Sequence, residues 1–174
     1  GQDEFGGDEV QDIVQLIHHA RKLPEWDRRN IYMFGWSRGG MMTLLALKYG
    51  VDVNAIALGA PLIDLTLNLD HADEKREAWV RRVIPDYDAH GVESLTARSA
   101  THWPEYIKVP TLLMHGDADA EVGSQHSEIL AQKLEAQGTP HQLILYPGGN
   151  HYLNKERQAV LDTVTGWFET HRKA

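Results

Sequence analysis

A serine, a histidine and an aspartate in this sequence could together cleave an acyl bond through a covalent intermediate. Ser37 lies in the segment 35–40, GWSRGG, and a serine hydroxyl can attack a carbonyl carbon. At its ordinary pKa this hydroxyl is a weak nucleophile, so an imidazole must accept its proton and a carboxylate must orient that imidazole. The chemistry therefore requires a histidine and an aspartate that the fold brings to Ser37.

The serine lies between a predicted strand and a predicted helix, the context that gives the G-x-S-x-G pattern its meaning. Residues 31–34 are a short, bulky apolar run typical of a buried strand, and residues 38–49 are apolar nearly all round, typical of a covered helix. So tight a turn strains the serine backbone. A side chain at position 35 or 39 is expected to collide with the neighbouring strand and helix, and Gly35 and Gly39 avoid these collisions. The turn also places the backbone amide of Arg38 at a helix N-terminus, where it can stabilise an oxyanion. A glycine-bearing connection without chemistry is the alternative.

Among the ten histidines, His151 alone follows a predicted strand in a glycine-rich loop. That strand covers residues 143–146, and the loop sequence is PGGN. His115 is the second candidate base, but it directly ends the strand 111–114, and we expect it to anchor its loop by a hydrogen bond. The other histidines are expected to be surface or packing residues: His18, His19, His71, His90, His102, His126, His141 and His171.

Two aspartates follow the strand at residues 111–114, in the loop sequence HGDADAEV. Spacing alone does not separate Asp117 from Asp119: one should reach the His151 imidazole, and the other should tie the loop through local backbone hydrogen bonds. The chain order is serine, aspartate, histidine. That order is expected when a parallel sheet presents the three groups at the carboxyl ends of successive strands.

The elements that must position these groups alternate between strand and helix, which favours an α/β fold with a mostly parallel sheet and helices on both faces. Further predicted elements are a strand at 53–58 and helices at 8–23, with Asp8 as N-cap, at 124–137 and at 154–170. We expect one domain over residues 1–174.

The span of about 61–110 breaks the alternation and is expected to be a cap-like insertion over the strand ends. It contains a charged helical stretch at 73–83 and the aromatic residues Trp79, Trp103 and Tyr106. These aromatic side chains are expected to roof the site or to pack within the insertion.

Composition excludes several classes of function. The formal net charge of -8 and the isoelectric point near 5.6 argue against nucleic acid as a partner. No apolar run approaches the roughly 20 residues that span a bilayer, so we expect a soluble protein without a membrane partner. The absence of cysteine removes disulfides and thiolate chemistry, and no H-E-x-x-H spacing occurs, so no metal and no cofactor is expected. Composition does not determine the compartment, although a cytoplasmic location is favoured over a periplasmic or secreted one.

The sequence resembles the α/β-hydrolases, and within them the catalytic domain of the prolyl oligopeptidase-like serine peptidases and their esterase relatives. The resemblance covers almost the whole chain and rests on these motifs: FGG at 5–7, GWSRGG at 35–40, KVPT at 108–111, HGDAD at 115–119, and His151 after GG at 148–149. In the family pattern H-G-x-x-D the fifth residue is the acid.

The resemblance implies a serine hydrolase that cleaves peptide or ester bonds through an acyl-enzyme. In this chain it implies Ser37 as nucleophile, Asp119 as acid, His151 as base and the Arg38 backbone amide as an oxyanion donor. A carboxylesterase or general acyl hydrolase shares these groups and is the first alternative. The alternative of another class is an inactive α/β module that acts in binding or assembly.

The family's sheet has more strands than the sequence predicts here, and the chain corresponds to the C-terminal part of that fold. A sheet that begins at residues 31–34 would expose an unpaired, apolar edge, and such edges invite pairing. We therefore expect an N-terminal segment, or a second copy of the chain, to complete the sheet. The second oxyanion donor, which such folds take from a loop after an early strand, is expected to lie in the same upstream segment.

Overall fold

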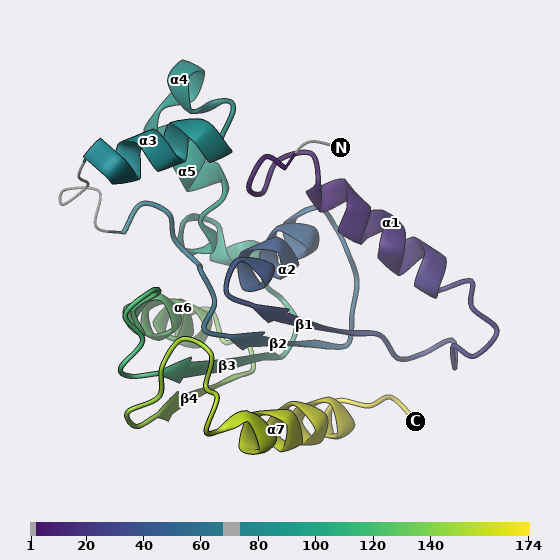
Figure 1. The fold of residues 1–174 in the computed structure, drawn as a ribbon. Helices are drawn as coiled ribbons and strands as arrows, with labels where there is room; N and C mark the ends of the chain where they lie inside the picture. Colours follow the sequence, from purple (N-terminus) through teal and green to yellow (C-terminus); the bar gives the residue numbers. More distant parts are fainter. Residues whose placement is uncertain (1–2, 68–73) are drawn as a thin grey trace.

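The computed structural model describes residues 3–67 and 74–174. Its centre is a four-stranded parallel sheet in the order β1-β2-β3-β4, so that strands adjacent in the sequence are adjacent in space (Figure 1). The strands are β1 Tyr32–Trp36, β2 Ala55–Gly59, β3 Thr111–Gly116 and β4 His141–Tyr146. The predicted parallel α/β architecture is confirmed. The C-terminal ends of the strands lie at most two residues beyond the apolar runs that predicted them.

Helices cover both faces of the sheet. They are α1 Val10–Ala20, α2 Arg38–Lys48, α3 Glu74–Val83, α4 Tyr87–His90, α5 Val92–Ala97, α6 Gln125–Ala136 and α7 Arg157–Thr170, with 3-10 turns at Ala100–His102 and Pro104–Tyr106. In Figure 1, α7 lies on one face, while α2 and α6 lie on the other with α1 outside α2. Helix α7, predicted to begin at residue 154, begins at Arg157.

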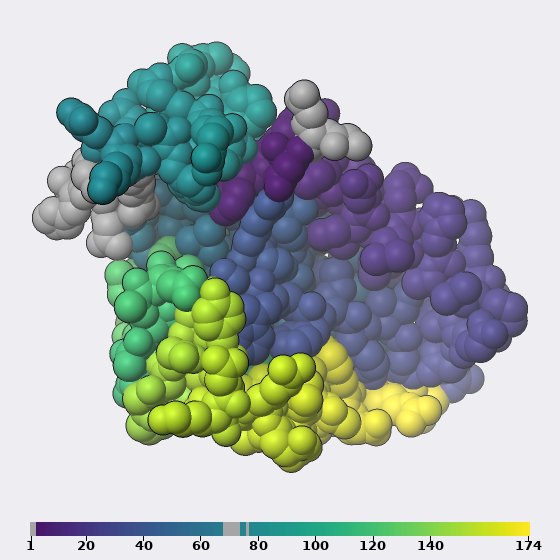
Figure 2. Space-filling model, viewed as in Figure 1, coloured from purple at the N-terminus to yellow at the C-terminus, as the bar shows by residue number. Residues whose placement is uncertain are grey.

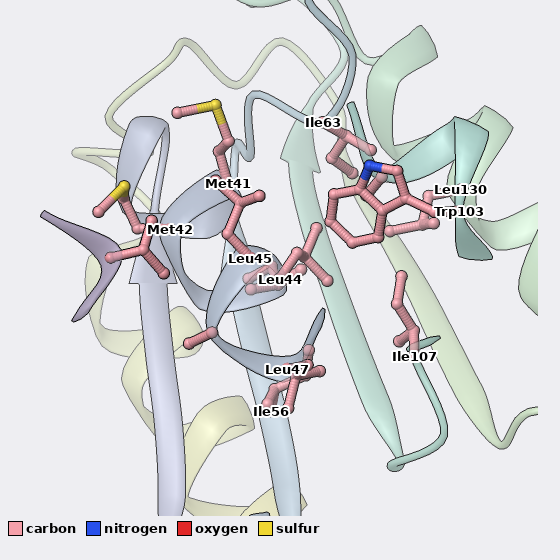
Figure 3. Close-up of a cluster of buried hydrophobic side chains, with 14 of the residues drawn as sticks. Met41, Met42, Leu44, Leu45, Leu47, Ile56, Ile63, Trp103, Ile107 and Leu130 are labelled. Atoms are coloured by element: carbon pink, nitrogen blue, oxygen red, sulfur yellow. The ribbon is translucent and has the colours of Figure 1, made fainter. Parts of the chain in front are cut away.

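Two apolar clusters hold these layers together. The larger lies between the sheet and α2, and Figure 3 shows Trp103 lying beside Ile63. The smaller lies under α7 and contains Val160 and Val164 of that helix. Because β2 and β3 are buried along their whole length, their side chains are mostly apolar on both faces, with the polar Thr111 and His115 near the two ends of β3.

The segment between β2 and β3 contains α3, α4 and α5 and stands as a separate layer at the upper left of Figure 1. The charged helix predicted at 73–83 begins at Glu74; residue 73 lies outside the described residues. Arg98, directly after α5, is only 6% exposed. It donates hydrogen bonds to the Phe5 carbonyl (3.2 Å) and to the Asp86 carboxylate (2.9 Å), so the insertion is tied to the N-terminal loop.

The predicted N-cap of α1 is wrong. The N-cap is Glu9 rather than Asp8, and no side-chain cap hydrogen bond is formed. Instead the Glu9 carboxylate turns back and accepts hydrogen bonds from the backbone N–H groups of Gly6 (2.7 Å) and Gly7 (3.1 Å). An acidic side chain at this place satisfies amides of the preceding loop, so the loop and the helix are fixed together.

Strand β1 forms one edge of the sheet among the described residues, since β2 is its only strand neighbour there. Phe34 on this strand is 44% exposed, although phenylalanine side chains are usually buried. The exposed edge that the sequence analysis anticipated is therefore present in the structure.

Candidate active site

Ser37 is the single residue between the end of β1 and the start of α2. Its backbone has φ 52° and ψ −120°, a strained conformation that non-glycine residues rarely adopt. Its N–H donates to the Gly59 carbonyl at the end of β2 (2.8 Å), and its carbonyl accepts from the amides of Gly40 (2.9 Å) and Leu62 (3.1 Å). These three bonds hold the strained serine in place at the carboxyl edge of the sheet.

The glycines around Ser37 do not all serve the purpose predicted for them. A Cβ at Gly35 would lie 2.4 Å from the Gly39 carbonyl oxygen and 2.5 Å from Thr43 Oγ1, so glycine is required there. A Cβ at Gly39 would meet nothing within 4 Å, and the expectation for that position is wrong. The crowded helical glycine is Gly40, where a Cβ would lie 2.6 Å from the Pro61 side chain.

Asp119 and His151 are hydrogen-bonded to each other although 32 residues separate them. His151 Nδ1 lies 2.7 Å from Asp119 Oδ2, and the side chains are 6% and 0% exposed. The other carboxylate oxygen, Oδ1, accepts from the backbone amides of Glu121 and Val122, both at 2.9 Å. The sheet therefore brings the predicted acid and base together in a dry environment.

The ionised form of Asp119 is favoured despite its burial. Burial raises the pKa of a carboxyl group, but the hydrogen bonds from the Val122 amide, the His151 imidazole and the Glu121 amide outweigh it. The pKa of Asp119 therefore falls below its ordinary value of 3.8. A carboxylate that stays charged can orient a neighbouring imidazole and stabilise its protonated form.

Asp117 contacts a different part of the molecule from its neighbour Asp119. Its Oδ1 accepts a hydrogen bond from the Gly148 amide (2.6 Å), which belongs to the loop that carries His151. The prediction of a purely local backbone contact is therefore wrong, because this aspartate ties the acid loop to the histidine loop. Asp119 makes the local contacts as well as the one to the imidazole.

The loop that carries His151 packs tightly against neighbouring backbone. The indole Nε1 of Trp36, at the end of β1, donates to the His151 carbonyl (3.0 Å). A Cβ at Gly116 would lie 2.2 Å from the Gly149 carbonyl oxygen, so the end of β3 needs glycine to let the loop approach. The histidine position is therefore set by contacts from β1 and β3 together.

Ser37 and His151 line one cavity of about 370 Å³. The other lining residues are Phe5, Leu62, Asp64, Leu65, Leu67, Trp79, Glu121, Val122, Gly123 and His126. In Figure 2 the insertion (teal) and the histidine loop (lime) stand on opposite sides of the blue surface that contains the serine turn. The cavity thus opens where the N-terminal loop, the insertion and the strand ends meet.

The insertion contributes one of its three singled-out aromatic residues to the cavity wall. Trp79 lies in the wall and packs edge-on against Phe5, with ring centroids 4.9 Å apart. Trp103 is 5% exposed and belongs to the core beside α2, and Tyr106 is not among the lining residues. Trp79 is therefore the roofing residue, and Trp103 packs within the protein.

Asp64 is a buried acid in the cavity wall that the sequence analysis did not single out. Its carboxylate accepts hydrogen bonds from the Thr66 amide (2.7 Å) and from the hydroxyl groups of Thr66 and Thr101. Burial raises its pKa, but these bonds outweigh burial and lower it. An aspartate inside the apolar run PLIDL was the available signal, since a charged residue in such a run is seldom buried without partners.

Arg38 has separate roles for its backbone and its side chain. Its amide lies in the first turn of α2, where N–H groups have no intrahelical acceptor and can bind an anion. The guanidinium forms ion pairs with Asp3 and with Glu9 (2.9 Å) and lies over the Phe5 ring, 4.6 Å from its centroid. The side chain therefore fixes the N-terminal loop against the serine turn.

The described residues offer neither a metal site nor a membrane-spanning helix. No group of three or more histidine, cysteine, aspartate or glutamate side chains in ranges 3–67 and 74–174 is arranged to hold a metal ion. In the same ranges no helix combines the length and the apolar character needed to cross a membrane.

Solved structures with the same fold define the class of the protein. The structure of this chain matches that of dipeptidyl peptidase 4 of Porphyromonas gingivalis with a TM-score of 0.77 and 22% identity, over 96% of this chain and 23% of that one. It matches a puromycin-hydrolyzing peptidase of Mycobacterium tuberculosis with a TM-score of 0.79 and 18% identity, over 99% and 26% of the two chains. The fold is that of the α/β-hydrolases.

Within this class the sequence identifies the family. The model of the prolyl oligopeptidase family matches residues 1–174, and the chain belongs to that family. It is 27% identical to the uncharacterized peptidase YtmA of Bacillus subtilis, over 97% of this chain and 66% of that protein. It is 26% identical to the acylamino-acid-releasing enzyme of Mus musculus, over 95% and 24% of the two chains. The chain thus spans less than two thirds of the length of these relatives.

Proposed function

We propose that this chain supplies the catalytic centre of a serine peptidase, with Ser37 as nucleophile, His151 as base and Asp119 as acid. The observation that carries the proposal is the buried 2.7 Å contact between His151 Nδ1 and Asp119 Oδ2, beside a cavity that both His151 and Ser37 line. Membership of a peptidase family supports peptide bonds as the substrate.

The proposed reaction proceeds in two halves. Ser37 Oγ attacks the carbonyl carbon while His151 Nε2 accepts the hydroxyl proton, and Asp119 stabilises the imidazolium. The oxyanion faces the Arg38 amide at the start of α2. The tetrahedral intermediate then collapses: the C–N bond breaks, the amine leaves with the proton from His151, and the acyl group stays on the serine. Water, deprotonated by His151, releases the acid and restores Ser37.

The same groups would hydrolyse a carboxylester, which remains the alternative substrate class. The peptide reading is favoured because named peptidases are among both the relatives and the structural neighbours. Neither alternative changes the roles of the three residues. A comparison of turnover on peptide anilides and on short-chain p-nitrophenyl esters distinguishes the two.

We infer that the open edge of β1 is covered in the working protein by an upstream segment of the polypeptide or by a second copy of the chain. The exposed Phe34 on that edge supports this inference, because an apolar strand edge in water is prone to pairing. The second oxyanion donor is expected from the same upstream segment. Loss of one such donor costs on the order of 100- to 1000-fold in turnover, so residues 1–174 by themselves should be slow.

Covalent labelling with a fluorophosphonate tests the proposal. We expect the whole protein to be labelled at Ser37, and Ser37→Ala to lose the label because it removes the attacking oxygen. Ser124→Ala is the matched control: it removes a hydroxyl that donates to Glu128 Oε1 (2.7 Å), and we expect it to label normally. A folded, unlabelled wild-type protein would contradict the proposal and favour a binding or assembly role.

A further inference from the structure

His115 is a buried imidazole in contact with the proposed acid. It lies near the carboxyl end of β3 and is 0% exposed. Its Nε2 lies 2.8 Å from the Val122 carbonyl oxygen and 3.2 Å from Asp119 Oδ2. Its Nδ1 lies 2.7 Å from the hydroxyl of Ser127 on α6. Both ring nitrogens therefore have partners, and the expectation that His115 anchors its loop is confirmed by the bond to Val122.

The partners determine where the ring carries its proton. A carbonyl oxygen and a carboxylate oxygen only accept hydrogen bonds, so Nε2 must carry the hydrogen. Nδ1 then accepts from the Ser127 hydroxyl. Burial lowers the pKa of His115, which keeps the ring neutral with this single N–H. Val122 and Asp119 thus determine the tautomer, which directs the Nε2 donor at them, and the Ser127 hydroxyl adapts to it by donating to Nδ1.

Asp119 Oδ2 lies within reach of two imidazoles. His151 Nδ1 approaches it at 2.7 Å and His115 Nε2 at 3.2 Å, while Oδ1 faces the amides of Glu121 and Val122. Donors on both oxygens fix the rotation of the carboxylate about its Cβ–Cγ bond. The His115 bond to the Val122 carbonyl also holds the loop end that supplies one of those amides.

We propose that His115 is a positioning residue: its Nε2 donor holds Asp119 Oδ2 in the orientation that accepts the hydrogen bond from His151 Nδ1. The proposal deepens the function proposed above and rests on it for its catalytic meaning. His115 itself does not line the cavity with Ser37. It acts through Asp119.

Proton NMR of the whole protein tests the proposal without requiring turnover. The Nδ1 proton of His151 in a short bond to a carboxylate should give a resonance far downfield of the amide region. We expect His115→Leu to lose this resonance and to slow fluorophosphonate labelling by about tenfold, the size of one lost hydrogen bond to a charged group. His115→Gln, whose amide nitrogen can replace Nε2 as a donor, should restore both readouts.

His141→Leu is the matched control, because it removes an imidazole from the neighbouring strand. His141 pairs with Thr111 at the far end of β3, and its Nδ1 contacts the Thr139 carbonyl (3.0 Å). We expect its resonance and labelling to match the wild type. If His115→Leu does not fold, His115→Phe decides: it keeps a planar ring at the buried position but removes the Nε2 donor, and the resonance should again be lost.

The outcomes separate this proposal from the one on which it rests. A folded His115→Leu variant, or in its place a folded His115→Phe variant, that keeps the downfield resonance overturns the positioning role. A wild-type protein that shows the resonance, loses it in His115→Leu and yet takes no label supports the positioning role and refutes the hydrolase. A purely structural role for His115 would lower the melting temperature and leave the resonance of the folded protein unchanged.

Discussion

Asp117 and Asp119 show how two identical side chains on one loop acquire different surroundings. Asp119 turns inward, where it meets the His151 imidazole, while Asp117 meets the Gly148 amide of the adjacent loop. Both contacts join the third strand end to the fourth, but only the inward one lies in a dry environment. The difference comes from which side of a short turn each residue occupies.

Replacing each aspartate by asparagine should separate the two roles. Asp119→Asn removes the charge and lets the imidazole adopt the wrong tautomer, and we expect fluorophosphonate labelling to slow on the order of 10³- to 10⁴-fold. Asp117→Asn keeps an acceptor oxygen for the Gly148 amide, so its labelling rate should stay within about threefold of wild type. Such a change corresponds to less free energy than the loss of one hydrogen bond. Equal losses in the two variants would contradict the assignment of Asp119.

At the scale of elements, the turn from β1 to α2 depends on close packing of backbone. The helix begins immediately after Ser37, so its first turn lies against the strand that precedes it. Space for a side chain is absent at Gly35 and present at Gly39, because the second position faces away from the strand. The G-x-S-x-G pattern therefore contains one glycine that the geometry of this chain requires.

Alanine at the two positions should have opposite consequences for stability. Gly35→Ala places a methyl group against the Gly39 carbonyl, and we expect a loss of about 2 kcal/mol or more in the free energy of unfolding. Gly39→Ala meets open space and should change that free energy by less than about 1 kcal/mol, in the stabilising direction, since alanine favours a helix. Urea unfolding measures both, and a Gly39→Ala variant as unstable as Gly35→Ala would refute the argument.

The edge of β1 gives a second prediction at this scale. Ser37 N–H and the Ile31 carbonyl both bond toward β2, so by alternation the amides of Tyr32 and Phe34 point to the open edge. If an upstream segment or a second copy covers this edge, as proposed above, these two amides should exchange slowly with deuterium in the whole protein. Fast exchange in a homogeneous monomer would show that the edge is free in solution.

The whole molecule is tied together by arginines that reach between segments distant in sequence. Arg98 lies after the insertion and binds the Phe5 carbonyl of the N-terminal loop, while Arg38 at the serine turn binds Asp3 and Glu9 of the same region. Phe5 in turn lies against the cavity-lining Trp79. The cavity wall therefore depends on contacts among three parts of the chain.

Arg98→Met should loosen this assembly. The substitution keeps apolar bulk but leaves buried carbonyls and Asp86 without their donor, and we expect a loss of about 2 kcal/mol in the free energy of unfolding at pH 7. Burial raises the pKa of Asp86, but the Arg98 hydrogen bond outweighs it and holds the pKa below 3.8. The stability that the Arg98–Asp86 pair contributes is therefore present above pH 3.8, and it disappears as the pH falls through the lower pKa of Asp86 in the folded protein. The difference in the free energy of unfolding between wild type and variant should therefore shrink below pH 3.8. A difference independent of pH would contradict the role of Asp86.

The sequence by itself determined the strands, their parallel pairing and the turn that carries Ser37. These features depend on local composition and on short-range steric limits, which a linear pattern records. The H-G-x-x-D resemblance pointed to Asp119, and the tertiary contacts agree with that choice, but spacing alone left Asp117 equally eligible.

Tertiary structure decided everything that depends on which surfaces meet. It determined that Asp117 joins two loops, that Gly40 rather than Gly39 is crowded, that Trp79 and not Trp103 lines the cavity, and that His115 contacts the acid. Such contacts join residues brought together by the packing of whole strands and helices. Their partners are set by the direction in which each side chain leaves its element, and no pattern of neighbouring residues contains that direction.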